Sequence, residues 1–367
     1  MGRLFQSRDV VVPMAIEEPS VVAAVSNMAR LVREAGGFAA DADRSVMIGQ
    51  VQLMGVTDPD AAVARLQAAA PDLAALAHQV HPRLVERGGG ATGVTVRKVT
   101  YDEPGRPVEH MVVVHLLFDC VDAMGANLVN TVAERLAPEI GRISGERIGL
   151  RILSNLASER LARATCALAP EHLAGPGLPG AEIAAGIAAA WRFAWADPWR
   201  AATHNKGVLN GIDPVVIATG NDWRAIEAGA HAWAARDGQY RSLTRWEVAA
   251  DGRLHGSIEL PIQAGTVGGG VRNHPTVAVS LKMLGHPRAQ ELAGILAAVG
   301  LAQNLGALRA LATEGIQRGH MRMHARGVAA QAGACDPMEI ETVVRGLCEA
   351  EDFSIELARQ ILAGMRR

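Results

Sequence analysis

The amino-acid sequence predicts an α+β fold: a large mixed domain, an inserted compact ferredoxin-like domain, and a C-terminal helical flap. Within residues 45–153 the spacing of apolar side chains changes between strand and helix periods in the order β-α-β-β-α-β, which is typical of the ferredoxin-like sandwich. From about residue 317 onward the chain is polar and has a helical pattern. The expected domains are therefore 1–44 together with 154–316, the inserted 45–153, and the flap 317–367.

The inserted domain is expected to contain six elements, each with its own signal. They follow one another as strand, helix, strand, strand, helix and strand at 46–54, 58–78, 94–101, 109–119, 126–139 and 147–153. Asp58-Pro59 is a typical helix start, and Pro71 must break or kink that helix. The turn D-E-P-G-R-P separates two alternating runs, which we therefore expect to pair as neighbouring strands.

The residues on either side of this domain predict further helices and strands. Helices are expected at 19–35, 181–196, 227–235 and 289–312, a short buried strand at 215–219, two or three strands within 239–262, and a glycine-rich loop at 265–270. The helix 289–312 is the most apolar long segment, but it contains Glu291, Gln303, Asn304 and Arg309. We therefore expect a buried helix and not a membrane span.

Composition excludes several classes of protein. The chain of 367 residues has 36 basic and 38 acidic side chains, whereas a nucleic-acid binder would need a basic excess. Its four cysteines show no C-x-x-C spacing and are typical of reduced thiols. The first ten residues lack the apolar stretch of a signal peptide. We expect a soluble cytoplasmic protein that binds neither nucleic acid nor membranes.

Three polar residues beside glycines carry the strongest indication of function. Lys206 lies in T-H-N-K-G-V-L-N-G, Asp222 in A-T-G-N-D-W-R, and His320 ends E-G-I-Q-R-G-H. We interpret these segments as turns in which the backbone approaches a ligand closely. A lysine beside a carboxylate polarises a carbonyl and a histidine delivers a proton, so the pattern favours an enzyme over a surface salt bridge. His320 and His324 lack the H-E-x-x-H pattern, so no metal is expected.

Other motifs leave two interpretations open. The segment D-A-M-G-A-N at 122–127 joins a strand to a helix, and it is either a nucleotide site at the helix N-terminus or an ordinary helix start. Glu18 precedes Pro19 and, on its own, indicates no more than helix initiation. Gln303 and Asn304 either bond to neighbouring backbone groups or face a ligand.

Taken in order, these motifs resemble those of the bacterial-type (class II) 3-hydroxy-3-methylglutaryl-coenzyme A (HMG-CoA) reductases. Matching strings stand at 17–20 (E-E-P-S), 122–127 (D-A-M-G-A-N), 203–207 (T-H-N-K-G), 219–225 (T-G-N-D-W-R-A) and 315–321 (G-I-Q-R-G-H-M). Further matches are I-G-Q-V-Q at 48–52, R-I-L-S-N-L-A at 151–157 and V-G-L-A-Q-N-L-G-A at 299–307. The resemblance runs from about residue 11 to the C-terminus.

The resemblance implies that two hydrides from a nicotinamide dinucleotide reduce the thioester of HMG-CoA to mevalonate and free coenzyme A, or the reverse. In such an enzyme Lys206 stabilises the oxyanion, Asp222 holds Lys206 and couples it to Glu18, and Glu18 donates a proton as the aldehyde intermediate is reduced. His320 protonates the departing coenzyme A thiolate, from a flap that closes over the ligands.

The resemblance also implies two sets of binding residues. The hydroxymethylglutaryl group is expected to contact Ser20, Arg200, Asn210 and Gln303, with Arg200 pairing with its carboxylate. The inserted domain is then the NAD(P)-binding domain, and its expected cofactor residues are His81, Asp122, Met124, Gly125, Asn127 and Thr131. The large domain is then expected to bind HMG-CoA and to form the dimer. Because family members form active sites between subunits, a homodimer or larger homo-oligomer is expected.

Two departures from the family pattern bear on the function. NAD-using relatives carry an acid seven residues before the glycine triplet 88–90, where it repels a 2′-phosphate, but this chain has His81 there and Arg83 close by. The rest of the chain is most similar to the NAD-using branch, so we predict NAD and a role in mevalonate catabolism, with an NADPH-dependent biosynthetic reductase as the alternative. The family's N-terminal helical segment with its E-N-x-I-G motif has no counterpart here. A truncated, inactive relative that only binds ligands is therefore a further hypothesis.

Overall fold

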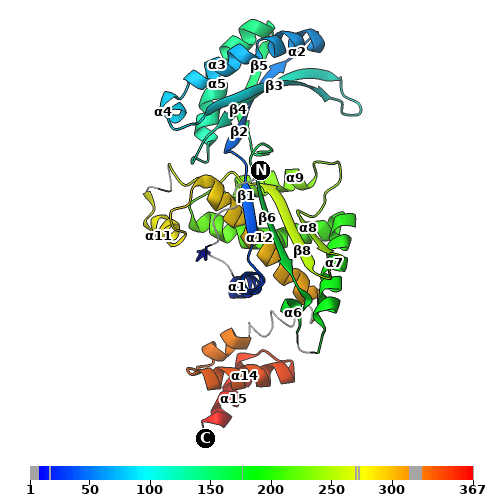
Figure 1. Cartoon of the computed structure of the whole chain (residues 1–367), viewed down its shortest axis with the longest axis vertical. Coiled ribbons are helices and arrows are strands. Elements are labelled where there is room, and N and C mark those ends of the chain that lie inside the picture. The colour runs from blue at the N-terminus through cyan, green and yellow to red at the C-terminus, as the bar shows by residue number, and fades with distance from the viewer. Residues whose placement is uncertain are drawn as a thin grey trace.

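The computed structural model describes residues 8–15, 18–175, 177–268, 271, 273–313 and 325–366. These residues form two four-stranded antiparallel sheets and a separate group of C-terminal helices (Figure 1). The buried hydrophobic side chains divide in the same way, into one cluster for each part. We name the sheets the upper and the central sheet after their places in Figure 1.

The upper sheet has the strand order β3-β4-β2-β5, and all neighbouring strands are antiparallel. Its strands are β2 (Val46–Met54), β3 (Gly90–Tyr101), β4 (Glu109–Asp119) and β5 (Arg147–Ser154). The helices packed on it are α2 (Pro59–Ala68), α3 (Ala70–Gln79), α4 (Pro82–Val85) and α5 (Ala126–Ser144). The predicted ferredoxin-like order is confirmed, and Pro71 lies in the first turn of α3, where the predicted helix is divided.

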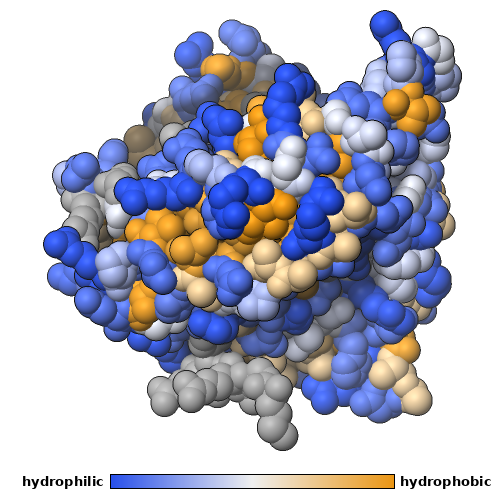
Figure 2. All heavy atoms as spheres, turned by 90° about the horizontal axis from the view of Figure 1, so that it is seen from above, coloured by the Kyte–Doolittle hydropathy of each residue, from blue (hydrophilic) through white to orange (hydrophobic). Residues whose placement is uncertain are grey.

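The surface at this end of the molecule is mixed. Figure 2, which is the view from above, shows hydrophilic side chains over most of it, with smaller hydrophobic patches between them. Leu150 and Ile152 of the edge strand β5 are 67% and 46% exposed.

Gln50 and His115 pair across neighbouring strands β2 and β4, with 2.9 Å between their side-chain nitrogens.

The central sheet has the order β1-β6-β8-β7 and is also antiparallel. Its strands are β1 (Ala39–Ala42), β6 (Leu161–Leu168), β7 (Thr244–Val248) and β8 (Leu254–Pro261), so the predicted region 239–262 holds two strands. The helices around it are α1 (Pro19–Glu34), α6 (Pro170–Leu173), α7 (Gly180–Ala196), α8 (Pro198–Ala218), α9 (Trp223–Ala234), α11 (Pro275–Met283) and α12 (Ala289–Ala312).

The long helix α12 is the centre of this part. By length and composition it could cross a membrane. It packs, however, against α1, α7 and α8 on one side and against β1, β6 and β8 on the other, and most of its side chains are buried there. As predicted, α12 is a buried core helix.

Two predictions for the region that carries Lys206 are wrong. Residues 215–219 were expected to form a strand, but they are the end of α8 and its C-cap, and Lys206 lies within α8 instead of in a turn. The helix continues through Gly211 and Pro214 because its buried face packs against α12. A Cβ atom on Gly211 would stand 2.7 Å from the Cβ of Gln303, so the glycine lets the two helices approach closely. Tertiary packing thus overrides the local propensity for a strand.

The C-terminal part consists of a helix at 325–331, α14 (Pro337–Ala350) and α15 (Ile355–Met365) around their own hydrophobic cluster. Arg366 pairs with Glu339 at 2.7 Å and fastens the end of α15 to α14. This agrees with the helical pattern expected for the flap. The limits of all three domains stay predictions.

Candidate active site

Helix α8 carries three residues that the sequence predicts to act on the substrate: Arg200, Lys206 and Asn210. The helix begins at Pro198, after Asp197 accepts a hydrogen bond from the amide of Arg200 at 2.9 Å. Lys206 and Asn210 are four residues apart and therefore share one face of the helix. The Lys206 ammonium is exposed, and in the described part of the chain no ion pair joins it to Asp222. The predicted Lys206–Asp222 contact is thus not formed within the single described chain.

The guanidinium of Arg200 is half-buried, and burial lowers its pKa from the usual value. Among the described residues, no carboxylate forms an ion pair with it. A partly desolvated cation without a counter-ion favours an anionic ligand, because such a ligand replaces the lost hydration with a charge-assisted hydrogen bond. This environment suits the expected carboxylate contact of Arg200.

A buried polar network lies behind this face of α8. His204 and Thr244 are 2.6 Å apart, and Asn304 Oδ1 accepts hydrogen bonds from Thr244 at 2.9 Å and from the Trp246 indole at 2.8 Å. Because the Thr244 hydroxyl proton goes to Asn304, the His204 ring must donate its Nε2 proton to Thr244. Burial, aided by the nearby charge of Arg200, lowers the pKa of His204 to about 3, so this ring is neutral. The network holds α8, β7 and α12 together and gives Asn304 a structural role.

Gln303, next to Asn304, differs from it. Its side chain is only 5% exposed, and its Oε1 atom has no hydrogen-bond partner among the described residues. The hydroxyl of Ser20, at the start of α1, is likewise buried and unpaired within the described chain. An unpaired buried oxygen costs about 1–3 kcal/mol, so a ligand that bonds to it is favoured. Of the two interpretations for the amide pair, Gln303 fits the ligand-facing one.

Asp222 is the N-cap of α9. Its Oδ1 atom accepts hydrogen bonds from the amides of Arg224 at 3.1 Å and Ala225 at 3.2 Å, and from the Arg224 guanidinium at 3.4 Å. Among the described residues, all of these bonds go to Oδ1. Oδ2 can therefore still accept a hydrogen bond from another group. Capping thus fixes the orientation of the carboxylate without using both of its oxygens.

The acid Glu18 caps a different helix, α1, which begins with Pro19. Its side chain is exposed, and its carbonyl accepts the amide of Val21 at 2.9 Å. Glu18 therefore lies at the start of α1 and contributes to helix initiation. His320 and His324 lie outside the described residues, as does Glu17.

The turn 122–127 leads from β4 into the N-terminus of α5. Gly125 is the N-cap with φ +104°, and a Cβ atom there would collide with the Cys120 sulfur, so only glycine fits. No side chain in the described parts of the chain caps α5, which leaves its first amides available for a phosphate group. Asn127 is exposed in the first turn, and Thr131 bonds to its carbonyl at 2.9 Å one turn later. These features fit the pyrophosphate of a dinucleotide.

His81 reaches the same helix from another element. It is the residue before α4, and its Nε2 atom lies 3.1 Å from the carbonyl of Leu128 in the first turn of α5. The ring also packs edge-on against Phe118 with 5.8 Å between ring centres. The structure therefore brings His81 next to the turn 122–127, although the two are about forty residues apart in sequence.

Asp122 and Met124 connect the turn to the central part, since a Cβ atom on Gly265 would collide with the backbone of Met124. Asp122 Oδ1 accepts the amide of Ala289, the first residue of α12, at 2.9 Å. Its carbonyl accepts the amide of Thr266 at 2.8 Å. Asp122 thus has a structural role in addition to its expected contact with the cofactor.

Comparison with known proteins gives the family of the chain. A model of the hydroxymethylglutaryl-coenzyme A reductase family matches residues 3–325. The chain belongs to this family. It is 47% identical over 363 residues to the 3-hydroxy-3-methylglutaryl-coenzyme A reductase of Archaeoglobus fulgidus, covering 99% of this chain and 80% of that protein. It is 37% identical over 324 residues to a probable reductase of Borreliella burgdorferi, covering 85% and 70%.

A solved structure agrees with this. The class II reductase of Streptococcus pneumoniae bound to NADPH is 43% identical, with a TM-score of 0.79 over 99% of this chain and 86% of that chain. The chain is therefore a class II HMG-CoA reductase family member and an oxidoreductase. The sequence-based recognition of the family is confirmed.

Sequence reasoning did not single out two residues of this HMG-CoA reductase family member that bind segments of the candidate site, Asn221 and Arg160. Asn221 pairs with both backbone groups of Gly265, at 2.7 and 3.0 Å, directly beside the cap Asp222. Arg160 donates to the carbonyls of Ala123 and Met124. Asn221 stands in a string quoted for the resemblance and Arg160 just after another, but nothing local in the sequence reveals their partners.

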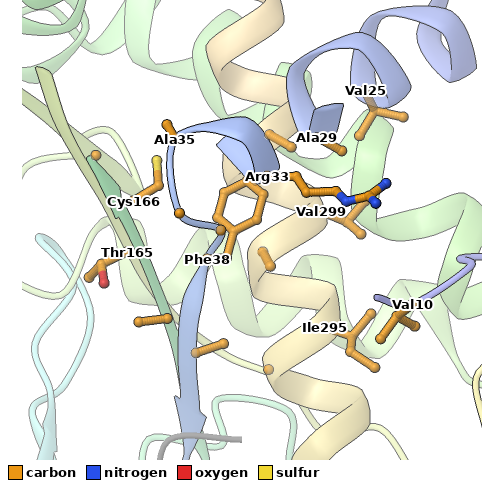
Figure 3. Close-up of a pocket in the computed structure, with 18 of the residues that line it drawn as sticks. Val10, Val25, Ala29, Arg33, Ala35, Phe38, Thr165, Cys166, Ile295 and Val299 are labelled. Atoms are coloured by element: carbon orange, nitrogen blue, oxygen red, sulfur yellow. The ribbon is translucent and has the colours of Figure 1, made fainter. Parts of the chain in front are cut away.

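A large cavity (Figure 3) is lined by none of the site residues that were predicted from the sequence and lie within the described parts of the chain. Its volume is about 1410 Å³, and it is lined by residues 8–12 and 14, the C-terminal half of α1, residues 35–40, parts of β6, β7 and β8, and α12. Phe38 and Arg33 face it beside Val299. Because Lys206, Asp222 and Arg200 all lie elsewhere, we do not take this cavity as the active site. The described residues contain no group of three or more metal-ligating side chains.

Proposed function

We propose that this protein interconverts HMG-CoA and mevalonate plus coenzyme A by two hydride transfers. In the reductive direction, HMG-CoA and two reduced dinucleotides take up two protons and yield mevalonate, coenzyme A and two oxidised dinucleotides. Family membership supports the reaction. The observation that carries it is the contact between the turn 122–127 and residues 264–267, because Gly265 of this segment is bound by Asn221, the neighbour of Asp222. These contacts support the proposal because they join the proposed dinucleotide region to the segment beside Asp222.

In the proposed mechanism Lys206 stabilises the oxyanion that forms when the thioester carbonyl is reduced. A fixed ammonium lowers the barrier because it is already oriented before charge develops. Asp222 Oδ2 holds Lys206, while Oδ1 stays bonded to the start of α9. Glu18 donates the proton as the aldehyde is reduced, and His320 protonates the coenzyme A thiolate as it leaves.

The proposed substrate residues bind the hydroxymethylglutaryl group by complementary chemistry. Arg200 pairs with its carboxylate, in keeping with the half-buried guanidinium that forms no ion pair among the described residues. Gln303 and Ser20 each have a buried oxygen that needs a partner. Asn210 lies one turn after Lys206 on α8. These four residues orient the substrate relative to the ammonium group.

For the dinucleotide we propose binding along the turn 122–127 and the start of α5. When bound, the nicotinamide supplies or accepts the hydride. The amides at the start of α5 bind the pyrophosphate, with Gly125 permitting close approach. Met124, Asn127, Thr131 and His81 line this region of the chain. Asp122 fixes the turn through its bond to Ala289.

NAD is our first candidate cofactor, in mevalonate catabolism, because of the overall resemblance to the NAD-using branch. NADP is the second candidate, and a specific observation favours it. The position where an acid would repel a 2′-phosphate is occupied by His81, which bonds to the start of α5, and Arg83 is exposed two residues later. The Streptococcus pneumoniae relative was solved with NADPH.

We further propose a soluble cytoplasmic homodimer in which a second copy completes the site. The supporting observation is that no ion pair joins Lys206 to Asp222 within the described chain, although both are expected to act on one oxygen. Sedimentation analysis of the purified protein tests this, and a monomer with full activity would contradict it.

The deciding experiment measures absorbance of the reduced nicotinamide with purified protein, mevalonate, coenzyme A and either NAD or NADP. We expect reduction of NAD, and omission of coenzyme A should stop the reaction before the thioester forms. Faster reduction of NADP would select the second candidate. A folded protein that reduces neither cofactor but binds coenzyme A would instead support the inactive ligand-binding relative.

A further inference from the structure

Arg160 is a buried arginine between the two sheets. It lies in the segment that connects β5 of the upper sheet to β6 of the central sheet, and it is only 4% exposed. Its backbone belongs to the central part, because its carbonyl accepts the amide of Ile262 at 3.1 Å. Its side chain reaches toward the turn 122–127. The residue therefore spans the junction between the proposed dinucleotide and substrate regions.

Within the described residues, the guanidinium bonds only to backbone carbonyls. It donates to Ala123 at 3.3 Å, to Met124 at 3.0 Å and, through its other terminal nitrogen, to Ala264. Burial lowers the pKa of Arg160 to about 10, and the nearby Cys120, Asp119 and Asp122 oppose this effect. The group is therefore charged at neutral pH. Charge-assisted bonds in a fork geometry are strong and directional, so they hold the two backbone segments in one relative position.

The same two segments also touch directly. A Cβ atom on Gly265 would collide with the backbone of Met124, and the amides of Thr266 and Val267 donate to the carbonyl of Asp122 at 2.8 and 3.3 Å. Ala123 and Val267 form a parallel β-bridge. Close backbone packing of this kind leaves little freedom once the guanidinium is in place.

Asn221 continues the connection toward Asp222. Its side-chain amide bonds to the N–H of Gly265 at 2.7 Å and to its C=O at 3.0 Å. Asn221 is also bonded to the hydroxyl of Thr219 at 3.1 Å, which fixes the amide in this orientation. A path of backbone and side-chain bonds therefore runs from Met124 through Arg160 and Ala264–Gly265 to Asn221, the residue beside Asp222.

We propose that Arg160 is a positioning residue that, with Asn221, clamps the turn 122–127 to residues 264–267 and so sets the distance between the dinucleotide and the substrate carbonyl. This inference rests on the proposed reductase function. A misplacement of about 1 Å can slow a reaction about a hundredfold, so a clamp at this junction affects hydride transfer more than the binding of either ligand.

The test substitutes Arg160→Lys, which keeps the charge but loses the planar fork. We expect the single-turnover rate of hydride transfer to fall about tenfold to a hundredfold, with the Kd for HMG-CoA unchanged. Mevaldehyde reduction should fall by the same factor. Hydrogen exchange at Thr266 and Val267 should accelerate, because their acceptor on Asp122 is no longer held.

Arg163→Lys is the matched control. Arg163 lies three residues further on and pairs with Asp43 and Glu259 at 2.8 Å, on the central sheet. Its substitution should lower thermal stability while leaving hydride transfer and the exchange of Thr266 and Val267 unchanged. If Arg160→Lys changed stability alone, like this control, the positioning role would be refuted.

Asn221→Ala gives a second measurement if Arg160→Lys fails to fold. It removes the far end of the same path from a half-buried position and should also slow hydride transfer and accelerate exchange at Thr266. Normal values for both would overturn the proposal. A wild-type protein that folds but does not turn over would refute the proposed function and with it the role in hydride transfer, whereas the exchange data would still decide whether the clamp exists.

Discussion

Gln303 of α12 lies directly against Gly211 of α8, so close that a Cβ atom on the glycine would stand 2.7 Å from that of Gln303. This crossing directs Gln303 toward the helix that carries Lys206. The next residue, Asn304, points instead toward β7, where it accepts hydrogen bonds from Thr244 and Trp246. Of these two neighbouring amides, Asn304 is hydrogen-bonded within the core and should stabilise the fold, whereas Gln303 has an unpaired oxygen in the described chain and should bind the substrate.

Gln303→Leu should leave thermal stability unchanged or raise it, because it removes a buried oxygen that has no partner in the described chain. The KM for HMG-CoA should rise about tenfold, equivalent to about 1.4 kcal/mol of lost binding. Asn304→Leu is the control: it leaves two buried donors unpaired, which costs about 1–3 kcal/mol each. Melting curves and steady-state kinetics of both variants test this. Equal destabilisation by the two substitutions would contradict the distinction.

Lys206→Ala should abolish both hydride transfers, because the oxyanion loses its fixed cation. Removing one such stabilising group costs about 100- to 1000-fold in kcat. Lys282→Ala, at an exposed position on α11, is the matched control and should leave the rate unchanged. The measurement is the rate with HMG-CoA and, separately, with mevaldehyde. Retention of either rate in Lys206→Ala would remove Lys206 from the proposed mechanism.

His320→Gln should separate the two steps. Reduction of free mevaldehyde should proceed at the normal rate since no thiolate leaves, while turnover of HMG-CoA should slow by about 100-fold or more, as expected for loss of a general acid. Stopped-flow traces with the two substrates give both rates. An equal fall in both would show that His320 does not act on the thiolate.

His204 should make stability depend on pH. Its pKa falls from 6.5 to about 3 on burial, so between these values the unfolded chain binds a proton that the folded chain does not. Stability should therefore decrease as pH falls from about 6.5 to about 3, by up to about 1.4 kcal/mol per pH unit. His204→Gln should be less stable at neutral pH but show a flatter dependence in this window. Urea unfolding across the range tests it, and an unchanged slope would contradict the assignment.

Much of the fold could be predicted because its signals are local. The strand 46–54 and the helix 289–312 match β2 and α12 at both ends, since each apolar pattern is long and bounded by turns or polar residues. The predicted strand at 215–219 failed because a short run of β-branched residues fits a strand or a buried helix end equally well. Only the contact between α8 and α12 distinguishes them.

The candidate site divides in the same way. Motif strings identified the family and the residue types needed for the chemistry, because they are contiguous in sequence. The sequence could not assign Gln303 and Asn304 to different partners, and it did not single out Arg160, whose bonds join residues 36 to 104 positions apart. The position of His81 at the first turn of α5 also depends on such a distant contact.

The sequence by itself thus determined the order and type of most elements, the reductase family and the chemical groups available for catalysis. Tertiary structure alone decided that Lys206 belongs to a helix, that Asp222 caps another helix through Oδ1, and that Arg160 and Asn221 bind the segment 264–265 from opposite ends. The physical reason is that propensity and motif act over a few residues, whereas burial, capping and buried hydrogen bonds depend on which distant segments the packed core brings together.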